Sequence, residues 1–75
     1  MKSNEFLGFL KTKGKNVRWL ETRMNEEGVR ITYATIYKKL RGESEFNAPE
    51  IKTISKVMDF TNEQMLDIFF DELVS

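Results

Sequence analysis

The chain of 75 residues contains no cysteine and no histidine. The absence of cysteine excludes disulfides and thiolate nucleophiles, and the absence of histidine removes the usual base of a catalytic triad. Zinc sites built from these two residue types are excluded for the same reason. We therefore expect no enzymatic activity, no catalytic residue, no metal ion and no cofactor, and a protein of the reducing cytoplasm.

Long apolar runs are also missing. No run approaches the roughly 20 residues that a membrane span requires, and the chain does not open with a signal-peptide pattern, so we expect no membrane association. Hydrophobic residues make up 40% of the chain and charged residues 32%, a balance typical of a folded domain. At this length we expect one domain over residues 1–75, with a core made from segments close in sequence.

The chain as a whole has no excess of charge of one sign, but its two halves do. The 12 basic and 12 acidic residues give a net charge of +0. Residues 1–42 carry ten Lys and Arg against four Glu, a net charge of +6, whereas residues 43–75 carry two Lys against eight acids, a net charge of −6. This polarity predicts one basic face and one acidic face. The basic half favours a nucleic-acid partner, although ordinary solubilising residues would give the same count.

Punctuation by Gly, Asn and Thr divides the chain into five helix-sized segments, and no segment alternates with the period of a strand. We expect helix caps at Ser3, Asn16 and Thr32, and capping boxes at Asn47/Glu50 and Thr61/Gln64. The polar stretch 25–30 predicts a turn after the second helix. The fold class is therefore all-α, a compact bundle of about five short helices.

Glu63, Asp67 and Asp71 are spaced to form one carboxylate stripe on the last helix. General acid–base catalysis needs carboxylates that face each other in unlike environments, and a convex row does not provide this. The chain also lacks a glycine-rich phosphate loop. We interpret the stripe as a solvated face. Trp19, Phe6 and Phe9 are expected in the core, whereas Phe69, Phe70 and Leu73 fit either the core or a dimer contact.

The second and third segments have the features of a DNA-reading unit, in which one helix braces another whose N-terminal half enters the major groove. Leu20, Met24, Ile36 and Leu40 are spaced to face a core. This leaves exposed, on the third helix, residues suited to base edges and phosphates: Tyr33, Ala34, Tyr37, Lys38 and Arg41. For Tyr33 and Tyr37 the alternative is partial burial at a helix contact, and for Tyr37 the two alternatives are equal. Five basic residues are expected to flank this face: Lys11, Lys13, Lys15, Arg18 and Arg23.

The segment Ile31-Thr32-Tyr33-Ala34-Thr35-Ile36-Tyr37-Lys38-Lys39-Leu40-Arg41-Gly42 resembles the recognition helix of phage Cro/repressor-type (XRE-like) helix-turn-helix proteins. Glu45-Phe46, Glu50-Ile51 and Ile54 are similar to the entry into their fourth helix, and Asp67-Ile68-Phe69-Phe70 resembles the end of small Gram-positive phage members. The resemblance implies a lambda-repressor-like domain that binds double-stranded operator DNA as a homodimer, with helix 32–41 in the major groove. It implies that Tyr33, Ala34 and Lys38 approach bases and that Thr32 and Thr35 contact phosphate or support the helix.

Three positions depart from the pattern of this family. Six residues separate Met24 from Ile31 where the family has a single glycine, so the turn is enlarged. Glu21 stands where the family has a small residue packed between the helices, and Val17 where a glutamine clamps a phosphate. The enlarged turn either reaches the DNA backbone with Arg30 or holds the two helices apart, and Glu21 turns either inward or to solvent.

Two functions follow from these features. The first is a transcriptional regulator, repressor or activator, that reads operator DNA through residues 32–41 with Arg18 and Arg30. The alternative is an antirepressor, a modulator of repression that binds the DNA-binding domain of a partner repressor protein. In that case the acidic half covers the partner's basic surface, and steering by charge gives specificity.

Overall fold

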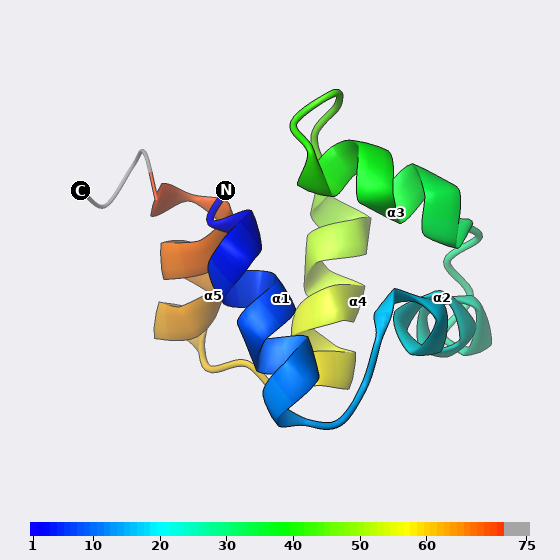
Figure 1. Ribbon diagram of the computed structural model, residues 1–75, viewed down its shortest axis with the longest axis horizontal. Helices are drawn as coiled ribbons and strands as arrows, with labels where there is room; N and C mark the ends of the chain where they lie inside the picture. The colour runs from blue at the N-terminus through cyan, green and yellow to red at the C-terminus, as the bar shows by residue number, and fades with distance from the viewer. Residues whose placement is uncertain (72–75) are drawn as a thin grey trace.

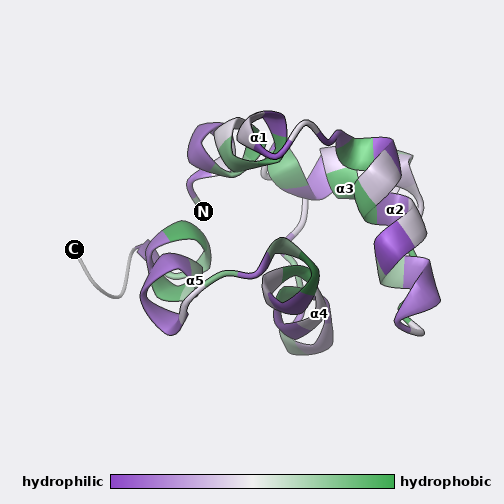
Figure 2. Ribbon diagram, turned by 90° about the horizontal axis from the view of Figure 1, so that it is seen from below, coloured by the Kyte–Doolittle hydropathy of each residue, from purple (hydrophilic) through white to green (hydrophobic). Residues whose placement is uncertain are grey.

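The computed structural model describes residues 1–71 and consists of five helices in that part of the chain. Three of them lie side by side in Figure 1: α1 (Ser3–Thr12) and α4 (Ala48–Met58) run downwards, and α5 (Asn62–Phe69) returns upwards. The other two, α2 (Val17–Glu26) and α3 (Tyr33–Leu40), pack at one side of these three helices, with α3 near the top of α4 (Figure 1). Figure 2 shows α1 lying across from the α4/α5 pair rather than in one layer with it. The prediction of a compact all-α bundle is confirmed.

Local capping explains where most helices begin. Asn16 Oδ1 accepts a hydrogen bond from Trp19 N, and Thr32 Oγ1 accepts one from Thr35 N. Both predicted capping boxes form, because Asn47 and Glu50 exchange hydrogen bonds of 2.9 Å, as do Thr61 and Gln64 at 2.8 and 3.1 Å. Each cap satisfies backbone N–H groups that have no partner within the helix.

Two boundaries differ from the sequence prediction. Ser3 is not a cap: the N-cap of α1 is Lys2, and Ser3 Oγ instead donates a hydrogen bond of 2.6 Å to Leu40 O at the end of α3. The predicted turn over residues 25–30 is also partly wrong, because α2 continues through Asn25 to Glu26. Asn25 and Glu26 are polar and remain exposed to solvent although they are helical. The chain turns only at Gly28, whose φ of +90° favours glycine.

All five helices contribute to one core. The predicted inward positions are buried, with Leu20, Met24 and Ile36 fully enclosed and Leu40 at 7% exposure. Phe6 is buried as expected, whereas Phe9 and Trp19 are partly buried against the core. The hydrophobic (green) parts of α1 turn toward α5 in Figure 2, and their outer sides are hydrophilic. The seam between these helices is also polar at one end, where Lys2 N donates a hydrogen bond to Ile68 O.

The aromatic residues at the end of α5 pack against the same core. Phe69 lies 6.2 Å from Phe6 and 5.9 Å from Phe46, measured between ring centroids. Phe70 is also partly buried there. Leu73, the third residue considered for a dimer contact, lies outside the described residues. The apolar residue that α5 does expose is Leu66, at 41%.

Candidate nucleic-acid interface

The outer face of α3 is formed by residues one helical turn apart. Ala34, Lys38 and Arg41 are exposed along one line, and Tyr33 and Tyr37 lie along the next. Tyr33 is half-buried rather than exposed, because it packs against the core and carries Arg18 on its ring. Tyr37 is 41% exposed, so the face on which Tyr37 lies is open to solvent. The face combines a small side chain, two phenols and two cations, which are groups that base edges and phosphates accept.

The guanidinium of Arg18 stacks on this face from α2. Its Cζ lies 4.0 Å from the ring centroid of Tyr33, within the range of a cation–π interaction. The Tyr33 ring in turn meets Tyr37 edge-to-face at 6.3 Å. These three side chains, called here the Arg18 stack, hold a cation beside the N-terminal half of α3. The structure thus brings together Arg18, Tyr33 and Tyr37, which the sequence analysis named separately.

Arg30 lies on the other side of the start of α3. It lines a shallow surface hollow together with Thr32 and Thr35, and its side chain is exposed. The Thr32 hydroxyl oxygen accepts from Thr35 N and lies 3.1 Å from the Thr35 hydroxyl oxygen, so these two residues support the helix N-terminus. Arg30 therefore lies beside the start of α3, and Glu50 also lines this hollow.

The basic residues around α3 differ in how many acids they already contact. Within residues 1–71, Lys38, Arg18 and Arg30 form no salt bridge, whereas Arg41 Nε lies 2.7 Å from Glu43 Oε2. Arg23 of α2 contacts Glu26 and Glu27 at 2.7 and 3.6 Å. Lys11 and Lys13 lie at the C-terminal end of α1, away from α3 in Figure 1. Lys15, just before α2, lies 5.4 Å from the Trp19 ring.

Three ionisable groups outside the face have shifted pKa values. The hydrogen bond to Glu26 raises the pKa of Arg23, and the hydrogen bond to Asp67 raises the pKa of Lys2. The hydrogen bond from Lys56 lowers the pKa of Glu27 below its ordinary value of 4.5. In each case the neighbour of opposite charge favours the ionised form. The Glu27–Lys56 pair joins the end of α2 to α4.

The C-terminal half of α3 is fixed by Lys39, which points away from the outer face. Lys39 Nζ lies 2.6 Å from Glu50 Oε1, and the two side chains are only 13% and 10% exposed. The same carboxylate oxygen accepts from Asn47 N in the capping box of α4. Lys39 Nζ also lies 5.6 Å from the Phe46 ring centroid. Neighbouring lysines of one helix therefore differ, with Lys38 open to solvent and Lys39 part of the packing.

The N-terminus of α3 is fixed by two residues that the sequence analysis did not name as site residues. Glu21 Oε2 accepts a hydrogen bond of 2.8 Å from Tyr33 N, so this side chain turns inward rather than to solvent. Asn25 Nδ2 donates to Ile31 O at 2.9 Å. The departure of Glu21 from the family pattern was the only sequence signal for these contacts. Val17, which also departs from the pattern of that family, is buried in the core.

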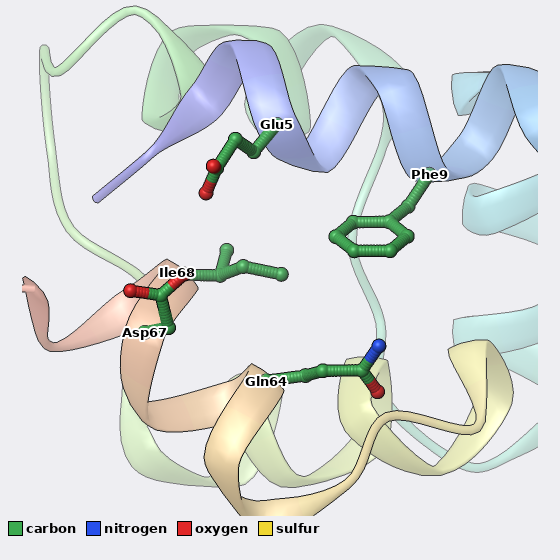
Figure 3. A pocket seen from close by; sticks show the side chains of 5 residues that line it. All are labelled: Glu5, Phe9, Gln64, Asp67 and Ile68. Carbon is green, nitrogen blue, oxygen red and sulfur yellow. The ribbon is translucent and has the colours of Figure 1, made fainter.

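A second hollow lies between α1 and α5 and is shown in Figure 3. Glu5 and Asp67 lie at one end of it and the Phe9 ring at the other, with Gln64 and Ile68 completing the lining. Lys2 Nζ lies 2.7 Å from Asp67 Oδ1 and 4.0 Å from Glu5 Oε2. Both carboxylates therefore have a cation from the same chain, and an incoming basic group would have to displace Lys2.

Within residues 1–71, no cluster of three or more acidic side chains is arranged to hold a metal ion. The helices of this part of the chain also lack the length and apolar character that crossing a membrane requires. The chain matches no protein-family model, and comparisons with curated proteins and with solved structures give no significant match. The interface is therefore judged on its own chemistry.

Proposed function

We propose that the protein is a sequence-specific DNA-binding regulator of transcription that uses α2 and α3 as a helix-turn-helix unit. In this proposal α3 enters the major groove with Ala34 and Lys38 nearest the base edges. The observation that carries the proposal is the outer face of α3, where Lys38 is exposed and unpaired within residues 1–71, one turn from the exposed Ala34 and next to the exposed Tyr37. An α-helix with such a face fits the width of the major groove.

The residues around this face supply the backbone contacts. Arg18 and Arg30 flank the N-terminal half of α3 from two sides, and neither is neutralised by a carboxylate within residues 1–71. Phosphate contacts of this kind fix the register of a protein on the duplex, whereas base contacts provide the specificity. The net charge of zero is compatible with this role because the charges are unevenly distributed, with a net charge of +6 over residues 1–42, which include α2 and α3, and −6 over residues 43–75.

We further propose that the protein binds operator DNA as a homodimer, as the resemblance to Cro and repressor proteins implies. A symmetric dimer reads two half-sites about one helical turn apart, which roughly squares the discrimination that one small domain achieves. Leu66 on α5 and Leu7 on α1 are exposed apolar side chains available for a dimer contact, and α5 lies at the end of the molecule away from α3 (Figure 1).

The test is a fluorescence-anisotropy titration of duplex DNA from the region upstream of the gene, with the variants Lys38→Ala and Lys52→Ala. Both substitutions remove one exposed lysine, but Lys52 lies on α4 rather than on α3. We expect Lys38→Ala to weaken operator binding about fivefold or more, since a good base contact contributes about 1–3 kcal/mol and about 1.4 kcal/mol corresponds to tenfold. Lys52→Ala should bind within about twofold of the unsubstituted protein. Equal affinities for the two variants would contradict the placement of α3 in the groove.

The alternative function, an antirepressor that binds a partner repressor through acidic residues, has weaker support. The carboxylate stripe expected on the last helix is shorter in the structure, because α5 ends at Phe69 and Asp71 lies beyond it. Asp67 contacts Lys2, and Asp71 lies 3.4 Å from the N-terminal ammonium group. Among the acids of residues 43–71, Glu45, Asp59 and Glu63 form no salt bridge, whereas the other four each contact a cation of the same chain. Only part of the acidic half is therefore free to meet a basic surface. Failure of the protein to bind any duplex, while still folded, would favour this alternative.

A further inference from the structure

The connection between α2 and α3 is long for two helices that must act as one unit. It comprises residues 27–32, and it includes Gly28 at a φ of +90°. A connection of this length does not by itself fix the angle between two helices. Reading DNA nevertheless requires that angle to be fixed, because a helix displaced by about 1 Å loses its directional hydrogen bonds.

Two side chains on one face of α2 cross this connection. Glu21 and Asn25 are one helical turn apart, and they form hydrogen bonds to the backbone on either side of the N-cap Thr32. Asn25 Nδ2 donates to Ile31 O at 2.9 Å and also to Glu21 O at 2.7 Å. Glu21 Oε2 accepts from Tyr33 N at 2.8 Å. We call these two residues the α2 clamp.

The contact made by Glu21 is the stronger half of the α2 clamp. A carboxylate that accepts a hydrogen bond from a backbone N–H forms a charge-assisted bond. It also places a negative charge at the N-terminus of α3, where the helix dipole is positive. Tyr33, whose amide is held, is the residue that carries the Arg18 guanidinium on its ring. The α2 clamp therefore fixes both the start of α3 and the position of the Arg18 stack.

We propose that Glu21 and Asn25 are positioning residues, which set the orientation of α3 on α2 and thereby the sequence specificity of DNA binding. This inference rests on the proposed function. Glu21 would then have opposite effects on affinity and on specificity. Its negative charge lies close to the DNA and lowers the affinity for any duplex, whereas its positioning of α3 raises the discrimination between duplexes. Removal of Glu21 should strengthen non-specific binding and weaken specific binding.

The variants Glu21→Ala and Glu21→Gln separate the two effects. Glutamine loses the charge but keeps an oxygen that accepts from Tyr33 N, whereas alanine loses both. We expect the ratio of operator affinity to scrambled-duplex affinity to fall about tenfold in Glu21→Ala and to stay within about threefold in Glu21→Gln. Both variants should bind scrambled duplex more tightly than the unsubstituted protein. A merely structural role would lower the folded fraction and leave this ratio unchanged.

The companion variant Asn25→Asp keeps the shape of the side chain but removes both N–H donors, and it should lower the same ratio. Glu26→Gln is the matched control, because it removes one negative charge from α2 at a residue that contacts Arg23 rather than α3. It should leave the ratio unchanged. An unchanged ratio in both Glu21→Ala and Asn25→Asp would overturn the inference.

Amide hydrogen exchange of the free protein tests the positioning role of Glu21 without DNA. The exchange rate of the Tyr33 amide should rise in Glu21→Ala and stay low in Glu21→Gln, since only the first loses the acceptor. If the unsubstituted protein binds no duplex, the proposed function fails, and this exchange measurement alone decides whether Glu21 positions α3. Equal Tyr33 exchange rates in all three proteins would overturn the positioning role.

Discussion

Lys38 and Lys39 are adjacent in the chain, but their side chains have opposite roles. Lys38 is exposed on the outer face of α3, whereas the Lys39 side chain is only 13% exposed and is paired with Glu50. We predict that Lys39→Met destabilises the fold and that Lys38→Met does not. Methionine keeps a flexible apolar stem of similar length at either position, so the comparison isolates the charged group.

The expected magnitude follows from the surroundings of Glu50. Removing one partner of a fully buried ion pair costs about 3–5 kcal/mol. Here each side chain keeps about a tenth of its exposure, and Glu50 retains its hydrogen bond from Asn47 N. We therefore expect a loss of about 2 kcal/mol for Lys39→Met. A domain of this size has a total stability of about 4–11 kcal/mol, so this loss is a large part of it.

Urea unfolding followed by circular dichroism and by the fluorescence of Trp19 measures the difference. With a slope of about 1 kcal/mol per molar urea for a chain of this size, the midpoint of Lys39→Met should fall by about 2 M. The midpoint of Lys38→Met should move by less than about 0.5 M. The double variant Lys39→Met/Glu50→Gln should recover part of the loss because no unpaired carboxylate remains. Equal midpoints for the two single variants would refute the reasoning.

Two further predictions concern the core and the Glu27–Lys56 pair. Ile36→Ala empties a fully buried position of α3 and should cost about 3 kcal/mol, a fall in melting temperature above about 10 °C; a fall below about 4 °C would contradict the packing described for α3. Glu27 has a lowered pKa, so the stability it contributes is present above its ordinary value of 4.5 and is lost as the pH falls through the folded value. The unsubstituted protein should therefore be more stable than Glu27→Gln at about pH 6, and the difference between their urea midpoints should shrink as the pH falls below 4.5. A difference that stays undiminished at low pH would argue against this cause.

Much of the helical architecture was predictable because its signals are local. Asn16, Thr32 and the two capping boxes each act within three residues, so the sequence contains both partners of every contact at close spacing. The inward faces of α2 and α3 follow from helical periodicity for the same reason. Ser3 shows the limit of such signals: its hydroxyl bonds to Leu40 O, 37 residues away, and this partner is set by the tertiary fold.

The candidate interface was predictable only in part. The exposed residues of α3 follow from periodicity, but which cations are free depends on contacts across the fold. Nothing local distinguishes Lys38 from Lys39, or shows that Arg18 stacks on Tyr33, 15 positions away. The inward turn of Glu21 depends on the path of residues 27–32, because the Tyr33 amide reaches the carboxylate only once that connection has folded back.

The central claim is that this protein binds DNA directly and reads its sequence. Its most direct test is a titration of the unsubstituted protein against fluorescent duplex from the region upstream of the gene and against scrambled duplex, at about 50 mM and about 200 mM salt. We predict tight binding to the upstream duplex and weaker binding to the scrambled duplex. We also predict that affinity falls at least about tenfold between the two salt concentrations, because cations such as Arg18 and Arg30 would displace counterions from phosphates. Equal affinity for both duplexes, or no binding by a protein whose circular dichroism shows it to be folded, would contradict the claim.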